Sequence, residues 1–595
     1  MTRLLFSITL LTLPAISMFA VKAWPGTIDY RQPDGSIIKV RIVGGRTHHY
    51  LMSAEGYPLM ALLSGECRYA MLDKDGYPVP SDMMISSIPT RKADEHAFLR
   101  NYNPANTIKA FERIVREKVD DITPYNKISA SDTKGRIGLC DSPLTAMGEK
   151  HTLVILCNYS DTKFSIENPK EFFSDMLNKE GFSEYGATGS VRDFFISNSG
   201  GKFAPVFDVY GPVDLPNKRF YYGRNNYYGN EPYAHEMVID AAKILDDEID
   251  FSRYDTDGDG IVDNVFIIYA GYGEADTARS ANVWPHSYEL IKAKPENRYI
   301  HDGVTLNHYA CTNELAGNYD RPAGIGTFVH EFSHVLGLPD LYTTVYNEAF
   351  TPGEWSTMDS GPYNNEGRTP PYYSSFERYA LGWLDPKPLD TGYIPIEPLP
   401  DSNCAYMVTG DSPNEFFLFE NRQQQGYDSF LPGHGLLIWH IDFDSDIWEK
   451  NTVNNDPDHQ RVDLIEADRD LYPETRDTDA FPTVYGYDKF TPLSDPAFLT
   501  WDGNPTSFAL TLISEKGNLI EVTVERNESQ VKTLTGDATG RWYRLEGRTL
   551  STIYNATLYD TQGHRLSYGD GFILPEAGIY MLKASTGETA KIYCK

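Results

Sequence analysis

The sequence of 595 residues predicts a multidomain chain with an α/β domain, an all-β sandwich domain and a small C-terminal β domain. The length exceeds what one hydrophobic core organises, and 41% hydrophobic residues suffice for several cores. Between residues 140 and 385, continuous apolar runs alternate with segments of helical spacing, which is typical of α/β domains. From residue 386 onward, short strands separated by Gly, Pro and Asp turns indicate β-sheet domains.

The N-terminus has the features of a targeting segment. Arg3 is a short charged region, and residues 4–19 are mostly apolar. Met18-Phe19-Ala20 and Val21-Lys22-Ala23 each offer a small-residue cleavage site. We therefore interpret residues 1–23 as the signal peptide of a secreted or cell-surface protein. The alternative is an uncleaved anchor, but the stretch is short for one, so we predict no transmembrane segment in the mature form.

Residues 24–139 are interpreted as an N-terminal prodomain. Residues 28–87 contain short strands separated by turn signals such as Gln32-Pro33-Asp34-Gly35. Residues 95–120 are polar with helical spacing, and residues 123–139 have the composition of a linker.

Residues 140–385 are predicted to form the α/β domain. Two apolar runs, one ending at Cys157 and one at residues 265–270, indicate buried strands. Helices are expected at 164–177, 190–199 and 236–245, with a further strand at 203–213.

Two further domains are expected after residue 385. Residues 386–530 are predicted to form a β-sandwich. Residues 531–595 are predicted to form a small β domain.

The most informative stretch begins at His330 and has the pattern HExxHxxGxxD. His330 and His334 lie one turn apart on one helix face, so both imidazoles can reach one metal ion. Gly337 lets the chain leave the helix, and Asp340 can then supply a third ligand. Glu331 is placed to act as general base. The alternative is an ordinary surface helix, but three ligands with one open position favour catalytic Zn²⁺.

Met358 lies in a small turn-forming segment, residues 353–361, shortly after Asp340. Metzincin peptidases have a Met-turn that lies beneath the metal as an apolar floor. A single Met in a turn is often simple packing. Its position here favours the Met-turn, so we expect a metzincin-like catalytic domain.

A second metal site is predicted at residues 255–263, which have the pattern DxDxDGxxD. Asp255, Asp257, Asp259 and Asp263 are spaced as in a calcium loop, and clustered carboxylates repel one another without a cation. The last EF-hand ligand position holds an apolar residue, so the loop is not an EF-hand. The alternative is an acidic surface turn; we favour structural Ca²⁺.

Composition excludes one class of partner. Fifty-three Lys and Arg against 84 Asp and Glu give a net charge of −31, which argues against nucleic acid binding. Six cysteines are scattered without a CxxC pair, so a cysteine-based zinc or redox site is not expected. Export permits disulfides, but the sequence does not choose a pairing.

The chain resembles the M6 peptidases, the immune inhibitor A-like secreted metalloproteases related to metzincins. The resemblance covers roughly residues 145–525, and the predicted helix that carries His330 and His334 is its most specific part. The stretches that carry it are 328–342, Trp355-Ser356-Thr357-Met358, Arg378-Tyr379-Ala380-Leu381-Gly382-Trp383-Leu384, 254–260, 269–273, 420–423 and 433–442.

This resemblance implies zinc at His330 and His334, with Glu331 as general base. Asp340 is the expected third ligand, and a later carboxylate, Asp359 or Glu366, is the alternative. Metzincins with a Tyr two residues after the Met differ from this chain, which has Ser360 there. The oxyanion donor is therefore unassigned, with Tyr363 as a weak candidate.

The last segment resembles the C-terminal sorting domains of type IX secretion in Bacteroidetes. The carrying residues are Gly571-Phe572-Ile573-Leu574-Pro575, Gly578-Ile579-Tyr580 and Lys591-Ile592-Tyr593-Cys594-Lys595. This resemblance implies passage across an outer membrane to the surface or the medium.

The expected function is a secreted zinc-dependent endopeptidase that cleaves protein or peptide substrates with a zinc-activated water. We expect a monomer. Two alternatives stay open: a secreted binding or adhesion protein with an inactive peptidase core, and a zinc aminopeptidase. For latency, the Cys140 thiolate is a candidate ligand for the open zinc position, against the alternative of a disulfide, with Cys157 as a candidate partner, or an inert thiol.

Overall fold

A computed structural model describes residues 19–594, except for several short stretches. The stretches outside the description are residues 47, 63, 120–136, 226–230, 296, 318, 320, 346–348, 528–542, 547–548, 560–564, 575–577 and 585–588. The chain divides into two compact units. One comprises residues 1–489 with 511–523, and the other residues 490–510 with 524–595. Several β-sheets accompanied by helices make this a multidomain protein of mixed α and β structure.

An antiparallel sheet of six strands in sequence order comes first in the chain. Its strands are β2 (Ile28–Arg31), β3 (Ile37–Gly45), β4 (His48–Ser53), β5 (Pro58–Ala61), β6 (Cys67–Leu72) and β7 (Pro78–Met84). Alternate side chains of β3, such as Val40, are buried, while those between them are exposed. Two helices follow, α1 (Ala93–Asn101) and α2 (Pro104–Val119).

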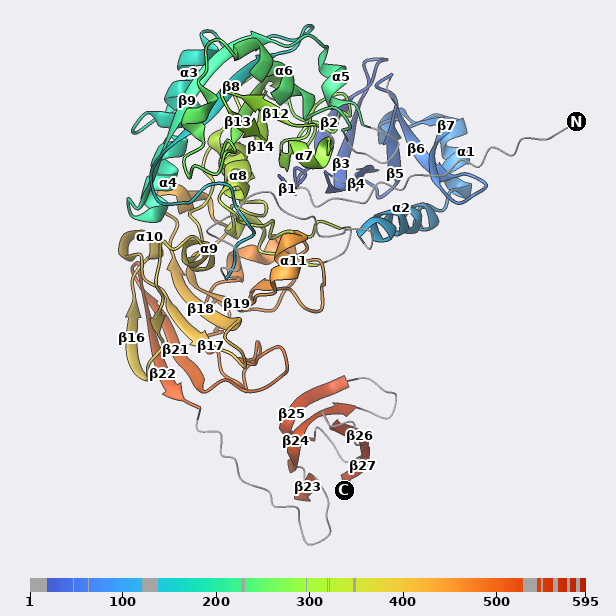
Figure 1. The fold of residues 1–595 in the computed structure, drawn as a ribbon. Coiled ribbons are helices and arrows are strands. Elements are labelled where there is room, and N and C mark those ends of the chain that lie inside the picture. The colour runs from blue at the N-terminus through green and yellow to red at the C-terminus, as the bar shows by residue number, and fades with distance from the viewer. Residues whose placement is uncertain are drawn as a thin grey trace, which may run out of the picture. The chain divides into compact units, whose positions relative to one another are not determined.

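Helix α8 (Ile325–Val335), which carries the HExxH motif, packs against a second six-stranded sheet (Figure 1). The strand order of this sheet is β1-β11-β14-β10-β8-β9. Four strands are parallel: β8 (Gly148–Asn158), β9 (Phe203–Asp214), β10 (Val265–Tyr272) and β14 (His308–Leu315). Strand β11 (His286–Glu289) pairs antiparallel with β14. The short strand β1 (Phe19–Ala20), from the start of the described chain, pairs antiparallel with β11.

Helices cover both faces of this sheet, and this explains the continuously apolar runs of β8 and β10. Val154 and Leu156 share a buried cluster with side chains of α3 (Pro169–Asn178), α4 (Val191–Ser199) and α8 (Ile325–Val335). Leu153 and Ile155 point to the other face, into a cluster that includes side chains of α6 (Glu236–Leu245). Successive residues of a strand point to opposite faces, so both sets are buried.

Two further sheets follow the α/β part in the chain. One is ordered β15-β17-β18-β19-β20: β15 (Lys387–Pro388), β17 (Tyr406–Thr409), β18 (Glu415–Arg422), β19 (Gly435–Asp442) and β20 (Val462–Leu464). The other comprises β16 (Gly392–Ile396), β22 (Leu519–Arg526) and β21 (Phe508–Lys516). Trp439 of β19 belongs to the same hydrophobic cluster as α8, so one core extends from the α/β part into this β part.

The second unit contains a separate five-stranded sheet, in which β24 pairs with β23, β25 and β26, and β26 with β27. Its strands are β23 (Tyr543–Glu546), β24 (Thr549–Tyr559), β25 (Arg565–Ile573), β26 (Gly578–Ala584) and β27 (Thr589–Cys594). Leu550, Leu558 and Leu582 lie in its own small core.

The remaining elements are short. They are β12 (Tyr299–His301), β13 (Val304–Leu306), α5 (Arg219–Gly223), α7 (Leu290–Ala293), α9 (Ser375–Ala380), α10 (Leu399–Ser402) and α11 (Ser445–Glu449). Over the described ranges, no helix has both the length and the apolar character needed to span a membrane.

Candidate metal centre

Helix α8 brings the two predicted histidine ligands together. His330 and His334 are four residues apart, and their Nε2 atoms lie 3.1 Å from each other. Both side chains are buried. The helix fits tightly here, because a Cβ on Gly326 would lie 2.0 Å from the carbonyl oxygen of Pro362. The sequence before the motif therefore lets α8 approach the neighbouring loop closely.

Asp340 joins the two histidines, as the motif predicts. Gly337 has a φ of +96°, so the chain turns away from the helix at a residue without a side chain. The Oδ1 atom of Asp340 then lies 3.2 Å from His330 Nε2 and 3.3 Å from His334 Nε2. Zinc about 2.0–2.1 Å from each ligand, at tetrahedral angles, needs ligand atoms about 3.3 Å apart. The three atoms therefore fit one zinc ion.

Hydrogen bonds fix which nitrogen of each histidine faces the ion. His330 Nδ1 lies 2.9 Å from the carbonyl oxygen of Thr357, and His334 Nδ1 lies 2.7 Å from that of Leu338. A carbonyl oxygen can only accept a hydrogen bond, so each Nδ1 carries the proton and each Nε2 keeps its lone pair for a metal. This arrangement is typical of zinc-bound histidines.

The electrostatics of Asp340 favour a charged ligand. Burial raises its pKa, but without a metal the protonated forms of His334 and His330 outweigh burial and lower the pKa to about 2. Its Oδ2 accepts a hydrogen bond of 2.6 Å from Asn451 Nδ2. Its Oδ1 is buried and, apart from the two histidines, has no hydrogen-bond donor in the described part of the chain, as expected of an atom that binds a metal.

Glu331 lies beside this group on the same helix. Its side chain is buried, and burial raises its pKa to about 8. One carboxylate oxygen, Oε2, has no hydrogen-bond partner among the described residues. The other, Oε1, accepts the backbone N–H of Val21 at 2.6 Å. Glu331 therefore contacts a peptide nitrogen that lies beside the metal ligands.

The alternative third ligands lie elsewhere. The Oδ1 of Asp359 binds Lys22 Nζ at 2.7 Å, and its Oδ2 accepts the N–H of Gly353 at 2.8 Å. Glu366 pairs with Arg321 at 2.7 Å. Of the described acidic residues, only Asp340 lies in the cluster with both histidines.

Met358 is fully buried in the core cluster that contains α8. Its carbonyl oxygen accepts the N–H of Leu341, the residue after Asp340, at 2.8 Å. The carbonyl of the preceding residue, Thr357, is the one that orients His330. The turn that contains Met358 therefore supports both ends of the candidate metal site.

A segment from the start of the described chain crosses the site. The ring of Phe19 lies against that of His334, with centroids 4.8 Å apart. The Tyr342 hydroxyl donates to the carbonyl of Ala20, and the next residue, Val21, meets Glu331. Residues 19–23 fall within the predicted signal peptide, which stays a prediction; in the structure Phe19–Ala20 form β1, an edge strand of the sheet.

Tyr342 is a contact that sequence reasoning missed. It is buried, and its hydroxyl meets the peptide unit whose N–H contacts Glu331. The available signal was its place two residues after Asp340. Tyr363, the oxyanion candidate from the sequence, donates instead to the carbonyl of Lys22, two residues beyond Ala20.

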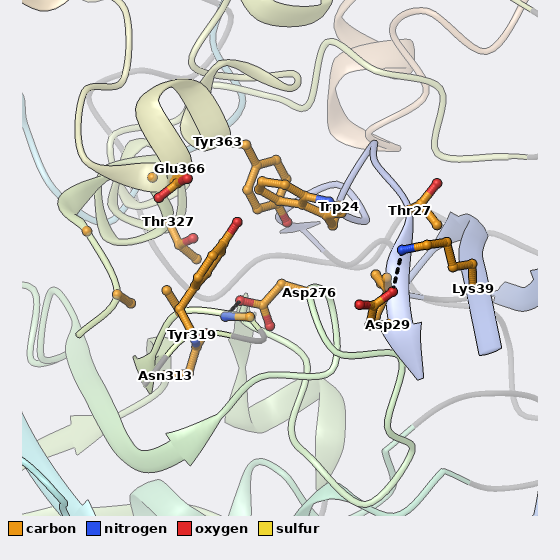
Figure 2. Close-up of a pocket in the computed structure, with 16 residues that line it drawn as sticks. Trp24, Thr27, Asp29, Lys39, Asp276, Asn313, Tyr319, Thr327, Tyr363 and Glu366 are labelled. Carbon is orange, nitrogen blue, oxygen red and sulfur yellow. Dashed lines mark hydrogen bonds and ion pairs between the residues drawn. The ribbon is translucent and has the colours of Figure 1, made fainter. Parts of the chain in front are cut away.

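A cavity of about 340 Å³ lies next to this segment (Figure 2). The ring of Trp24 meets that of Tyr363 edge-on, with centroids 5.0 Å apart, at the border of the cavity. Thr327 of α8 and Asp276 also line it. The Oδ1 of Asp276 is buried without a partner among the described residues.

The predicted calcium loop places three of its four carboxylates together. Oxygens of Asp255, Asp257 and Asp263 lie within 4.8 Å of one another. Asp259 is outside this group, and its Oδ1 accepts the N–H of Ile261 at 2.8 Å. Burial raises the pKa of Asp263 to about 7.

Cys140 is buried and is not part of the cluster of His330, His334 and Asp340. Its Sγ donates to the carbonyl oxygen of Trp448 at 3.3 Å, and its N–H donates to the carbonyl of Gly337. Neither Cys140 nor Cys157 is part of a disulfide, so the two are not paired with each other. The described thiols are not part of the metal-binding cluster of His330, His334 and Asp340.

Comparison with known proteins agrees with this chemistry. Residues 149–385 match the model of the immune inhibitor A peptidase M6 catalytic domain. The chain is 28% identical over 267 residues to the pre-pro-metalloprotease PrtV of Vibrio cholerae serotype O1, an alignment that covers 38% of this chain and 28% of PrtV. It is 27% identical over 264 residues to immune inhibitor A of Bacillus thuringiensis subsp. alesti, covering 37% and 38% respectively. The chain thus matches about a third of the length of these relatives.

Proposed function

Because residues 149–385 form a catalytic domain of the immune inhibitor A (M6) peptidase family, we propose that the protein is a secreted zinc endopeptidase with a metzincin-like site. The single observation that carries the proposal is the triangle of His330 Nε2, His334 Nε2 and Asp340 Oδ1, with sides of 3.1–3.3 Å. Glu331 beside it supplies the base. When bound, zinc would polarise the peptide carbonyl and lower the pKa of water.

The peptide unit that joins Ala20 to Val21 indicates how the residues act on a substrate. Its N–H points to Glu331, and its carbonyl oxygen accepts from Tyr342. Glu331 takes a proton from water and delivers it to the leaving nitrogen. Tyr342 donates a hydrogen bond to the carbonyl oxygen, where negative charge develops.

An open-ended path through the site favours endopeptidase over aminopeptidase activity. The segment enters along β11 through Phe19 and leaves toward Trp24 and its cavity. Chain therefore extends on both sides of the peptide unit at Glu331. An aminopeptidase closes one side to hold the free α-amino group, whereas the described segment continues on both sides of this peptide unit, from Phe19 to Trp24.

Latency follows from the same segment, and we infer that the protein is made as a zymogen. A second contact holds the proposed prodomain on the α/β part: Arg46 pairs with Glu231 at 3.0 Å, and both side chains are buried. Glu231 also accepts the backbone N–H of Trp284, whose indole Nε1 donates to the carbonyl of Val21 at 2.9 Å. Prodomain docking and occupation of the site are thus physically linked.

The Cys140 latency hypothesis stays a prediction, and so does secretion by the type IX route. If the thiol contributes to latency, Cys140→Ser raises the activity of the unprocessed chain.

Secretion by the type IX route requires residues 531–595, so their removal would keep the protein inside the outer membrane. Latency through residues 19–22 requires that these residues stay on the exported chain, whereas signal-peptide cleavage after Ala20 or after Ala23 breaks the segment; N-terminal sequencing of the exported protein distinguishes the two.

We also propose that Asp255, Asp257 and Asp263 hold a structural calcium ion. The loop precedes β10, a central strand of the sheet that supports α8. Calcium neutralises carboxylates that otherwise repel one another. A calcium-selective chelator should then lower the melting temperature while zinc stays bound, and an unchanged melting temperature contradicts the site.

The proposed peptidase activity is tested with casein as substrate. The activated protein should cleave casein, lose activity with a zinc chelator and regain it when zinc is restored. Cleavage that survives complete zinc removal contradicts the proposal. Zinc binding without cleavage of any protein on a broad panel favours the binding-protein alternative.

A further inference from the structure

The ammonium group of Lys22 lies in a preformed binding position for a cation, near the candidate metal ligands. Its Nζ lies 2.7 Å from Asp359 Oδ1 and 5.7 Å from the centre of the Tyr342 ring. The Asp359 side chain is 0% exposed, whereas that of Lys22 is 30% exposed. The partly exposed ammonium side chain therefore reaches a carboxylate held in the protein core.

The surroundings of Asp359 fix its carboxylate in place. Oδ2 accepts the N–H of Gly353 at 2.8 Å, and the Ser360 hydroxyl donates to Oδ1 at 3.1 Å. Burial raises the pKa of Asp359, but the charge and hydrogen bond of Lys22, with smaller contributions from a Thr351 hydrogen bond and the charge of Arg476, together outweigh burial and lower it. Arg476 also lowers this pKa, but its guanidinium pairs with Glu354 at 2.9 Å. Lys22 is thus the cation in direct contact with Oδ1.

The register of the segment shows which substrate position Lys22 represents. The Ala20–Val21 peptide unit has its nitrogen on Glu331 and its oxygen on Tyr342, as a bond about to be cleaved would. Lys22 is the second residue after this bond. When the segment dissociates from the site, the second residue after the scissile bond of a substrate can occupy the position of Lys22.

A buried carboxylate without a cation is costly, so the vacated site selects for one. Lys and Arg carry the required charge on long apolar stems that can reach a buried carboxylate. The Tyr342 ring adds a cation–π contact on the way. An apolar or acidic side chain at this position would leave Asp359 uncompensated or opposed.

We propose that Asp359 forms a specificity subsite for a lysine or arginine at the second residue after the scissile bond. This inference rests on the proposed peptidase function and names the substrates that the site prefers. Asp359 directly follows Met358, so the turn that supports the metal ligands also contributes the residue that recognises the basic side chain of the substrate.

The test uses the full chain, activated by limited proteolysis until casein cleavage appears. Peptide libraries with mapped cleavage points should show Lys or Arg enriched at the second residue after the cut. Matched peptides with Lys or Leu at that position should differ in kcat/KM by about tenfold or more, as expected for a charge-assisted hydrogen bond. In Asp359→Asn this ratio should fall close to one.

Glu354→Gln is the matched control. Glu354 is an acid in the same turn, but it pairs with Arg476 at the surface, with its side chain 36% exposed. Its loss should leave the preference intact. Zinc content and melting temperature of both variants show whether Asp359→Asn is folded.

A second measurement does not depend on that variant. The hexapeptide Phe-Ala-Val-Lys-Ala-Trp, the sequence of residues 19–24, should inhibit the activated wild type about tenfold better than the same peptide with Leu for Lys. Equal inhibition, or casein cleavage without a basic preference at the second position, overturns the inference and leaves the peptidase proposal standing. Absence of any cleavage by zinc-loaded wild type removes the proposed function itself.

Discussion

Asn451 holds Asp340 by two hydrogen bonds across 111 residues of chain. Its Nδ2 donates to Asp340 Oδ2 at 2.6 Å, and its Oδ1 accepts the Asp340 N–H at 2.9 Å. Asn451 follows α11, in the part of the chain after β19. The β part thus orients the third candidate zinc ligand, so the metal centre does not depend on the α/β part alone.

Replacing Asn451 tests this support directly. Asn451→Ala should weaken zinc affinity by about 10–100-fold, because partners that orient a metal ligand typically contribute this much. Asn455→Ala is the control, since Asn455 binds the N–H of Thr344 at 2.7 Å without touching Asp340. Zinc competition with a chromogenic chelator gives both affinities. Equal affinities in the two variants would show that Asp340 does not need its amide partner.

Tyr342 is predicted to stabilise the transition state. Tyr342→Phe should lower kcat by about 10²–10³-fold with little change in KM, because the hydroxyl donates where charge develops. Tyr363→Phe should instead act mainly on KM, since Tyr363 contacts a carbonyl two residues further along the segment. Steady-state kinetics on one peptide substrate separates the two effects. A Tyr342→Phe enzyme with wild-type kcat excludes the role.

Loss of the Lys22 anchor should weaken latency. Lys22→Ala removes the ion pair with Asp359, so the segment should leave the site more often and the unprocessed chain should show more activity. Lys163→Ala, which breaks an exposed pair with Asp214, is the control. Activity on a quenched peptide is measured before activation, and N-terminal sequencing confirms the same start. No gain over the control would place latency elsewhere.

The buried pair of Arg46 and Glu231 should matter for zymogen stability. Arg46→Met leaves a buried carboxylate without its cation, which costs about 3–5 kcal/mol. The exposed pair of Lys39 and Asp29 should contribute only about 0–1 kcal/mol, so Lys39→Ala is the comparison. Urea unfolding of the full chain followed by fluorescence measures both. Similar midpoints for the two variants contradict the proposed clamp.

The sequence predicted the features that depend on local spacing. His330 and His334 are brought together by helix periodicity, and Asp340 is reached by a short turn at Gly337. The buried strands β8 and β10 follow from continuously apolar runs. In each case the residues involved are close together in the sequence, so the local sequence pattern is enough to predict the structure.

The features that the sequence did not predict depend on contacts between distant segments. Asn451 and Asp340 meet through sheet packing, and Val21 meets Glu331 across 310 residues. Asp359 was considered as a zinc ligand because it follows Met358, but its carboxylate binds Lys22. The apolar N-terminal pattern predicts a signal peptide, but it does not predict that Phe19 and Ala20 pair with β11 as strand β1.

The most direct test of the central claim joins metal content to activity in one variant pair. Wild type and Glu331→Gln are purified, loaded with zinc, activated in the same way and assayed on casein. We predict one catalytic zinc in each, lost in Asp340→Ala, and cleavage by the wild type that falls by at least about 10³-fold in Glu331→Gln. Full activity in Glu331→Gln, or undiminished zinc binding in Asp340→Ala, would contradict the account.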